Sequence, residues 1–270
     1  VVKIDPKGNH SEFCAESAVF AAEKVIDKQG GVHGPVSHQK AWYEMIHRYL
    51  AGALGLVILL IASMAWASRA SRGLPTALVG VVCFQAALGM WTVTLLLKPV
   101  IVTLHLLGGM ATLALMVWLA ARQFKFRAIP RDARQLRPWA ILGLALLSLQ
   151  IALGGWVSTN YAVLACTQFP MCQDSWWPAM NFSSAFELWR PLGLMRDGQT
   201  IPFEALTAIH YTHRLMAYVV FLVLGGLAWA MRSQGLRTQA RWLKWLLLLQ
   251  LLTGVSNVVL DWPLLAAVLH

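Results

Sequence analysis

Six long apolar runs constrain this chain more than any other feature. Each is close to the roughly 20 residues that a helix needs to cross the hydrocarbon core of a bilayer. The chain is 58% hydrophobic and only 13% charged, unlike a water-soluble domain. Backbone polar groups in lipid must be satisfied within their own segment, so such runs fold as helices. The sequence predicts an all-α polytopic membrane protein with spans at 46–67, 76–97, 100–121, 138–158, 209–231 and 243–260, and a seventh run starting at Pro263.

Basic residues gather in the three connections that follow residues 67, 121 and 231. These connections hold twelve Lys and Arg and one acid, Asp132, and so carry +11; the rest of the chain has ten basic and eleven acidic residues and carries −1. Loops rich in Lys and Arg stay on the cytoplasmic side of a membrane. We therefore place these connections in the cytoplasm and the long 159–207 segment, called the outer loop, outside. Membrane insertion accounts for the basic face, and we expect no nucleic-acid partner.

An internal repeat relates two halves of the chain. Three pairs of landmarks share an offset of 165 or 166 residues: His47 and His213, Gln85 and Gln250, and His105 and His270. The segment "QAALGMWTV" at 85–93 also matches "QIALGGWVS" at 150–158. An offset of four helices returns the second unit in the same orientation, as in parallel repeats. We expect two pseudo-symmetric four-helix bundles and eight helices in all, with the first helix ahead of Val1 and most of the last beyond His270.

This organisation divides the chain into four parts. They are a polar extracytoplasmic segment at 1–45, an N-terminal half at 46–121, a basic cytoplasmic linker at 122–137, and a C-terminal half at 138–270 that contains the outer loop. Three histidines, His10, His33 and His38, fall in the polar segment, where a solvated surface position is expected.

Four other histidines form two matched pairs in the membrane helices. His47 and His105 lie at similar depth in the N-terminal half, and His213 and His270 repeat that arrangement in the C-terminal half. A single intramembrane histidine is often a packed, hydrogen-bonded residue. Two imidazoles that face each other across a helix bundle instead make a bis-histidine axial site for haem iron, and the repetition favours this reading. Zinc would require three or four close ligands, and each half offers two.

One position differs between the halves. Glu44 precedes His47 by three residues and so shares its helix face, while His210 stands in the corresponding place before His213. One half therefore has a carboxylate beside its candidate haem site. The alternative for Glu44 is a solvated interfacial acid paired with Arg48, and for His210 an interfacial role is favoured.

Arginines and glycines accompany the paired histidines. Arg48 and Arg214 directly follow His47 and His213, and they either bind haem propionates or extend to lipid headgroups. Glycines in "LGM", "HLLGGM" and "LGGW" remove side-chain bulk near the candidate sites. They are equally suited to close helix–helix approach.

The cysteines indicate an oxidising outer compartment. Cys166 and Cys172 stand six residues apart in the outer loop, where they either close a small disulfide ring or remain as two free thiols. Cys83 lies alone in a span and is expected to pack in the helix core.

Five segments together resemble the haem A synthase family. They are "EMIHRYLAG" at 44–52, "VTLHLLGG" at 102–109, "GGWVSTNYAVLACTQFPMCQ" at 154–173, "AIHYTHRLMA" at 208–217 and "PLLAAVLH" at 263–270. The resemblance covers about residues 40–270 and implies a location in the bacterial plasma membrane, or in the mitochondrial inner membrane of a eukaryote. Residues 1–40 differ from the family, whose members begin with a membrane helix and a loop rich in Cys, Trp and Pro.

The resemblance implies an enzyme that oxidises the C8 methyl of haem O, through hydroxymethyl and gem-diol stages, to the formyl group of haem A for terminal oxidase assembly. By position, His47 and His105 belong to the substrate-haem site, His213 and His270 ligate a haem b cofactor, and Glu44 matches the catalytic acid. The outer-loop cysteines match the family pattern. Expected partners are membrane lipid, haem O, the haem O synthase that supplies it, an unidentified electron donor and a second copy of the chain in a homo-oligomer.

Two other functional classes fit the histidines. A di-haem membrane cytochrome b that acts only in electron transfer would share the pattern but would not require Glu44. A proton-coupled transporter that uses the histidines as relay groups would be colourless. Farnesyl transfer to haem is disfavoured because the chain has no Asp-rich DxxxD motif for a magnesium diphosphate.

Overall fold

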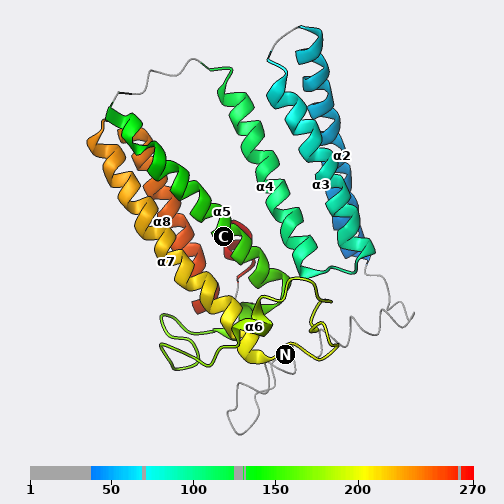
Figure 1. The fold of residues 1–270 in the computed structure, drawn as a ribbon, viewed down its shortest axis with the longest axis vertical. Coiled ribbons are helices and arrows are strands. Elements are labelled where there is room, and N and C mark those ends of the chain that lie inside the picture. The colour runs from blue at the N-terminus through cyan, green and yellow to red at the C-terminus, as the bar shows by residue number, and fades with distance from the viewer. Residues whose placement is uncertain (1–37, 69–70, 125–129, 131, 261–262) are drawn as a thin grey trace. The chain divides into compact units, whose positions relative to one another are not determined.

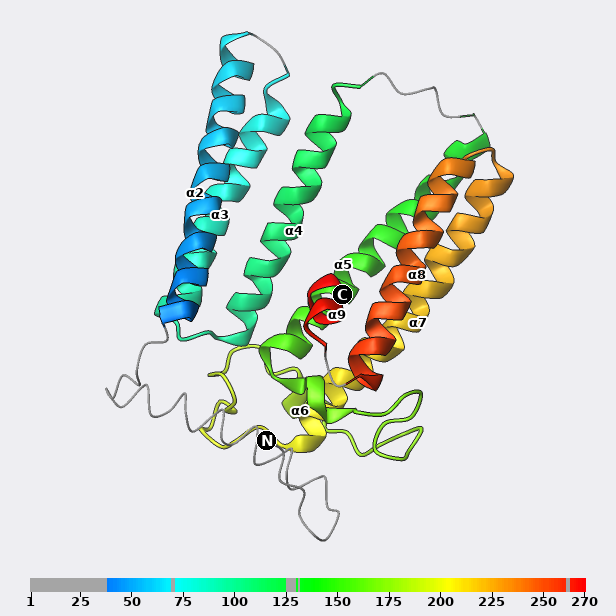
Figure 2. The same cartoon turned by 180° about the vertical axis from the view of Figure 1, so that it is seen from behind.

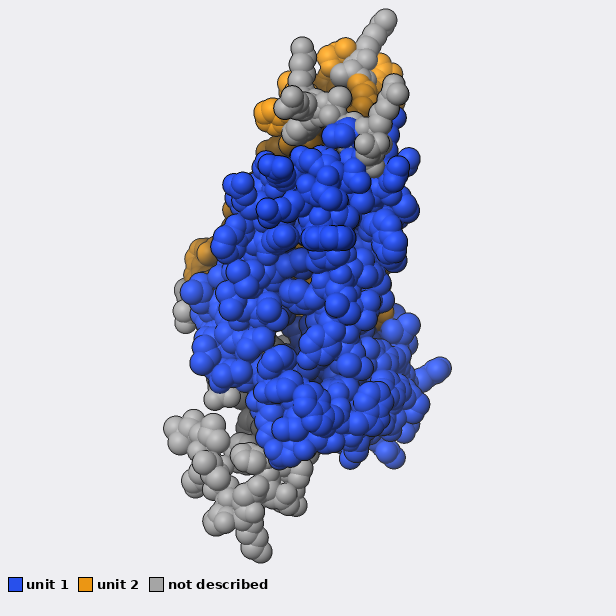
Figure 3. Space-filling model, turned by 90° about the vertical axis from the view of Figure 1, so that its left-hand side faces the viewer, with its two compact units in different colours: residues 1–19, 127–270 blue, residues 20–126 orange. Residues whose placement is uncertain are grey.

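The computed structural model describes residues 38–68, 71–124, 130, 132–260 and 263–270. Helices make up most of this part of the chain, in which the only β pairing is two isolated bridges, Cys172 with Ser175 and Leu194 with Thr200. The described residues fall into two compact units, one ending at Phe124 and the other starting at Pro130 (Figure 3). Predicted features within residues 1–37, including His10 and His33, lie outside the described residues.

The first unit consists of three long helices: α2 (His38–Ala67), α3 (Gly73–Thr94) and α4 (Pro99–Ala121). α3 packs against both α2 and α4 (Figures 1 and 2). Ile58, Leu78 and Leu88 are almost fully buried between these helices. The seam is narrow, because most other apolar side chains of this unit face outward.

The described part of the second unit contains three long helices and four short ones. In chain order they are η1 (Asp132–Leu136), α5 (Arg137–Thr159), η2 (Ala162–Ala165), α6 (Phe182–Ala185), α7 (Phe203–Ser233), α8 (Arg237–Val259) and α9 (Leu264–Leu269). α7 packs against both α5 and α8, α9 lies on α8, and α6 and η2 pack on α7 (Figures 1 and 2). The apolar core of this unit is built on Val220, Leu224 and Leu227 of α7. α7 is therefore the central element of the unit.

Prolines and left-handed residues mark the helix ends. Pro99 and Pro138 stand in the first turn of α4 and α5, where the missing N–H has no intrahelical partner to lose. α3 ends at Thr94, three residues before the end of the predicted span, because Leu96 and Leu97 adopt positive φ of 54° and 56°. The chain then turns directly into α4.

Two helices extend beyond their predicted spans. α2 begins at His38 rather than at residue 46, and α7 begins at Phe203 rather than at residue 209. The predicted bounds followed apolar character, whereas a helix continues into polar sequence for as long as its backbone hydrogen bonds can form. The polar residues that precede His47 and His213 are consequently helical, and the outer loop shortens to residues 160–202.

The exposed surface of both units is strongly apolar. Leu60, Met64 and Leu222 are 63%, 69% and 77% exposed, and six described helices have the length and hydropathy of membrane spans. Water would disfavour so large an apolar surface, whereas a bilayer solvates it. The predicted all-α polytopic membrane fold is confirmed.

Close packing of α5 on α7 depends on Gly143. A Cβ at this position would lie 2.6 Å from Cδ2 of Leu224. We expect Gly143→Ile to lower stability by about 1–3 kcal/mol through overpacking, measured as a lower unfolding midpoint in detergent. Gly226→Ile is the matched control, because a Cβ at the exposed Gly226 meets nothing within 4 Å. Equal midpoints for the two variants would contradict this role.

Candidate functional site

The first candidate site joins α2 and α4 in the first unit. His47 comes from α2 and His105 from α4, and their ring centroids lie 6.4 Å apart with an interplanar angle of 82°. The two residues are 58 positions apart in sequence, so only the helix packing brings the rings together. The predicted pairing of these histidines matches this geometry.

The second unit contains an equivalent pair. His213 comes from α7 and His270 follows α9, and their ring centroids are also 6.4 Å apart, with an interplanar angle of 90°. The same separation in the two units shows that the paired histidines, which correspond in the sequence repeat, also have matching geometry.

The separation of the rings fits one iron atom between two imidazoles. A metal–imidazole bond of about 2.0 Å and a distance of about 1.1 Å from nitrogen to ring centre place two rings on opposite sides of one metal roughly 6.2 Å apart. Among the described residues, no three His, Cys, Asp or Glu side chains gather as a metal site. The donor set of each pair therefore suits haem iron, whose four remaining ligands come from the porphyrin.

Glycines form the surfaces on which the imidazole rings lie. A Cβ on Gly89 or Gly154 would lie 3.1 Å from Cε1 of His105 or His213, and one on Gly254 would lie 2.8 Å from Cε1 of His270. Each glycine belongs to a helix next to the one that carries the histidine. A larger residue would crowd the ring, most of all at Gly254, so the glycines allow each helix to lie close to its histidine ring.

A glutamine four residues before each glycine binds the backbone of the histidine segment. Gln85 Nε2 donates to the His105 carbonyl at 2.6 Å, and Gln150 Nε2 donates to the His213 carbonyl at 3.2 Å. Gln250 Nε2 donates to the Leu269 carbonyl at a longer 3.5 Å. The repeated Q-x-x-x-G pattern is therefore a device that holds a histidine-bearing segment against the neighbouring helix. Sequence reasoning found the repeat but missed this role.

Glu44 and His210 occupy very different surroundings. The Glu44 carboxylate pairs with Arg48, at 2.5 Å between Oε1 and Nη2, and both side chains are 54% exposed. His210 is 3% exposed, and its Nδ1 lies 2.9 Å from the Ala162 carbonyl. The one half thus has an exposed carboxylate on the helix of its histidine pair, and the other has a buried imidazole that binds the η2 segment.

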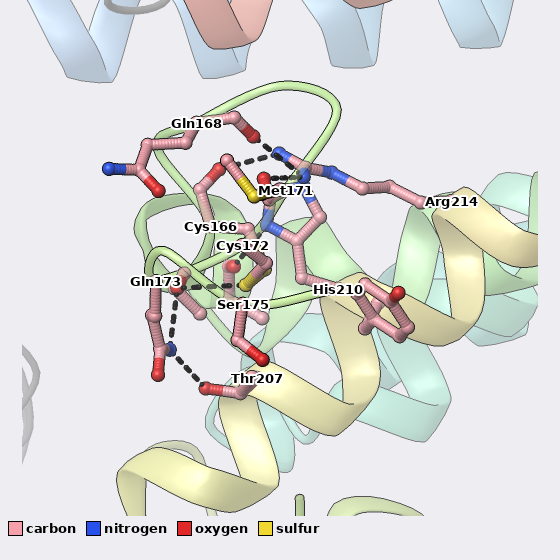
Figure 4. Close-up of a disulfide and its surroundings, with 12 residues drawn as sticks. Cys166, Gln168, Met171, Cys172, Gln173, Ser175, Thr207, His210 and Arg214 are labelled. Carbon is pink, nitrogen blue, oxygen red and sulfur yellow. Dashed lines mark hydrogen bonds between the residues drawn. A yellow bond between two sulfur atoms is a disulfide. The ribbon is translucent and has the colours of Figure 1, made fainter. Parts of the chain in front are cut away.

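Arg214 binds the outer loop. Its Nη1 donates to the carbonyls of Gln168 and Met171 at 2.8 and 3.2 Å, and its Nη2 donates to that of Cys166 at 2.7 Å. The close-up in Figure 4 shows the guanidinium reaching from α7 into the loop beside the disulfide. Neither of the two expectations for Arg214, contact with haem propionates or with lipid headgroups, included these loop carbonyls. Arg48, which follows His47, makes no such contact and pairs with Glu44.

The outer-loop cysteines form the predicted disulfide. Cys166 and Cys172 are bonded and almost fully buried, and they pack against Tyr211 of α7. The Tyr211 hydroxyl donates to the Trp176 carbonyl, and Gln173 Nε2 donates to Thr207 Oγ1 at 2.8 Å. One face of α7 thus holds the disulfide loop directly beside the turn that carries His213.

Other polar residues of the outer loop were not identified from the sequence. Arg190 is 1% exposed, its Nη2 donates to Asn160 Oδ1 at 2.5 Å, and its guanidinium lies 5.9 Å from the Trp156 ring centre. Burial lowers the pKa of Arg190 to about 10, against an opposing effect of the Glu187 carboxylate. Nothing in the sequence pattern distinguished this buried arginine from the exposed ones.

The expectation for Cys83 was wrong. Its side chain is exposed on the outer face of α3 and does not pack in the core. A helix that is apolar on all sides gives no periodic signal that separates lipid-facing from core-facing positions.

A family model described as cytochrome oxidase assembly protein, COX15-CtaA, matches residues 6–270. The chain belongs to this family. A haem A synthase of Shewanella oneidensis is 39% identical over 239 residues, covering 87% of this chain and 72% of the relative. Haem A synthases of Rhizorhabdus wittichii and Methylobacterium radiotolerans are 25% and 30% identical; the alignments cover 99% and 84% of this chain, and 77% and 63% of those relatives.

These findings confirm the resemblance to the haem A synthase family that the motifs indicated. The six apolar helices and the bacterial relatives identify a polytopic protein of the bacterial plasma membrane. Family membership also implies a haem as substrate and a haem-related cofactor.

Loss of the Arg214 contacts should loosen the disulfide loop. Hydrogen bonds from a charged donor contribute about 1.5–3 kcal/mol each, so Arg214→Gln should raise the opening rate of the loop at least about tenfold. The measurement is the rate at which a water-soluble phosphine reduces Cys166–Cys172, read by thiol alkylation and mass. The control Arg196→Gln removes an exposed arginine of the same loop. Equal rates for the two variants would show that Arg214 does not hold the loop.

Proposed function

We propose that this chain acts as a haem A synthase, an oxidoreductase that converts the C8 methyl of haem O to the formyl group of haem A. The observation that carries the proposal is the pair of histidine sites, each with ring centroids 6.4 Å apart. The chain's family and its relatives named haem A synthase support the same activity.

Each histidine pair is assigned one haem. His47 and His105 bind the substrate haem O, and His213 and His270 hold haem b as the resident cofactor. Haem iron, when bound, supplies the redox chemistry that amino-acid side chains lack. The protein's own contribution is to hold two imidazoles 6.4 Å apart in each unit, and to hold the segments of His105, His213 and His270 through a glutamine and a glycine.

Glu44 is the candidate proton-transfer group. It stands one helical turn from His47 on the same helix, at the end of α2 where Arg48 binds its carboxylate. A carboxylate at this place can accept a proton as a methyl carbon is oxidised and return it on dehydration of the gem-diol. The other unit has His210 in the corresponding position, and that ring is buried against Ala162. The chemistry is therefore assigned to the N-terminal half.

Electron transfer alone is a weaker account of the molecule. A di-haem cytochrome b would use both sites in the same way and would not need Glu44 beside only one of them. The relatives named haem A synthase also favour the enzyme. The haem O synthase, the electron donor and the homo-oligomer remain predictions from the family resemblance.

The histidine pairs predict a defined haem content. We expect His213→Ala to remove the haem b absorption and His105→Ala to remove the substrate haem. Each variant would leave its site with a single histidine to hold the haem. The measurement is the absorption spectrum of the purified protein with identification of the extracted haems by mass. A colourless wild-type protein would contradict the haem assignment and favour a transporter.

The proposed role of Glu44 predicts that its removal lowers haem A formation without loss of bound haem. We expect Glu44→Ala to reduce haem A formation about 10²–10⁴-fold, the usual contribution of a general acid–base group, with both haem sites still loaded. Haem A per cell membrane is measured after expression with haem O synthase. Glu204→Gln is the control, since this exposed acid on α7 lies away from both histidine pairs in sequence. Normal haem A formation in Glu44→Ala would rule out the catalytic role.

A further inference from the structure

Gly89 and Gly254 contact the rings of His105 and His270 in the same way, but the residue before the glycine differs between the two halves. Leu88 precedes Gly89 in the first unit, and Thr253 precedes Gly254 in the second. The two positions correspond under the offset of 165 residues that relates His105 to His270. Both side chains are buried, at 1% and 7% exposure. The repeat thus places an apolar group in one site where the other has a hydroxyl.

The Thr253 hydroxyl lies beside Nδ1 of His270. Thr253 Oγ1 donates its single proton to the carbonyl of Leu249, at 2.9 Å, or to that of Gln250, at 3.2 Å. Its lone pairs remain to accept, and Nδ1 of His270 lies 3.2 Å away. Nδ1 is then the protonated nitrogen of the ring. The lone pair on Nε2 is left free for a metal, as a ligating imidazole requires.

Leu88 cannot perform this role for His105. In the described part of the chain, the buried Nδ1 of His105 has no hydrogen-bond partner, and neither has the buried Oε1 of Gln85. No side chain therefore fixes the tautomer of this ring or strengthens its donation to a metal. His105 is held in place by Gly89 and by the bond from Gln85 to its carbonyl.

The partner of His270 has a polar contact of its own. Gln150 Nε2 lies 3.1 Å from Nδ1 and 3.3 Å from Nε2 of His213, and the buried Oε1 of Gln150 has no partner among the described residues. His213 and His270 thus each have a polar side chain beside the ring, in contrast with the unpartnered Nδ1 of His105.

A haem that is a substrate must enter and leave its site, whereas a resident cofactor must stay through many turnovers. Two sites with identical ligands and identical surroundings could not meet both requirements. A hydrogen bond to the second nitrogen of a ligating imidazole orients the ring and raises its basicity, and its loss commonly lowers metal affinity about 10–100-fold. The difference between Thr253 and Leu88 lies at this position.

We propose that Thr253 is a positioning residue that retains the resident haem on His213 and His270, and that Leu88 leaves His105 an exchangeable ligand. The inference rests on the proposed function for which haem is substrate and which is resident. The different residues beside His105 and His270 belong to this chain itself. It explains how one duplicated device serves one haem that stays and another that is processed and released.

The first test measures haem release from the C-terminal pair alone. The purified holoprotein carries His47→Ala and His105→Ala, and transfer of haem b to excess apomyoglobin is followed by absorption. Thr253→Val should release haem about 10–100-fold faster and raise the midpoint potential, because the imidazole donates less to the iron. Thr253→Ser should restore both values. Thr112→Val is the matched control, since its buried hydroxyl donates only to the Gly108 carbonyl.

The second test transfers the hydroxyl to the other half. In a protein with His213→Ala and His270→Ala, Leu88→Thr should slow haem b release from the His47–His105 pair and lower its midpoint potential. Unchanged release and potential in Thr253→Val, or in Leu88→Thr, would overturn the proposal. Neither test uses haem A formation. A wild-type protein that makes no haem A would therefore refute the proposed function while these release rates and potentials still decide the role of Thr253.

Discussion

The contact between an imidazole ring and a backbone glycine on the neighbouring helix is the interaction on which the two sites depend. Gly89, Gly154 and Gly254 each remove the one atom that would displace a histidine ring. With that space available, helices that present His47, His105, His213 and His270 can approach until two rings stand at the separation of axial ligands. The glutamine one turn earlier prevents the histidine-bearing segment from sliding, since it occupies a backbone carbonyl there.

The same device is used in two settings, and the differences around it separate the roles of the halves. In the second unit, α7 binds the disulfide loop through Tyr211 and Arg214, and it binds the η2 segment through the buried His210, so the turn carrying His213 is held by the outer loop. In the first unit, the corresponding end of α2 carries the exposed Glu44–Arg48 pair. A rigid site suits a retained cofactor. An open site with a carboxylate suits a haem that is bound, oxidised and released.

Much of this architecture could be predicted from the sequence. Apolar runs long enough to span a bilayer can only be helices there, so the six spans followed from length and composition. The histidine pairs followed from the repeat, because an offset of four helices returns each landmark to the same depth. Helix ends were less predictable: polar sequence before His47 and His213 is helical as well, and Leu96 and Leu97 end α3 early through their backbone conformation. The place of Cys83 was missed because a helix apolar on every side has no periodic marker of its packed face.

The sequence by itself determined the membrane fold, the duplication and the identity of the paired ligands, since these depend on hydrophobic length and on spacing along one chain. Only the tertiary structure decided what the ligands rest on and what surrounds them. In the sequence, the Q-x-x-x-G pattern is no different from other apolar helix sequence, and its contact with a histidine-bearing segment is visible only in the packed structure. The hydrogen bonds from Arg214 to the outer loop are likewise visible only there. Thr253 and Leu88 are both ordinary residues of a membrane helix in one dimension. The difference between them matters because the packing of the helices places Thr253 Oγ1 3.2 Å from Nδ1 of His270.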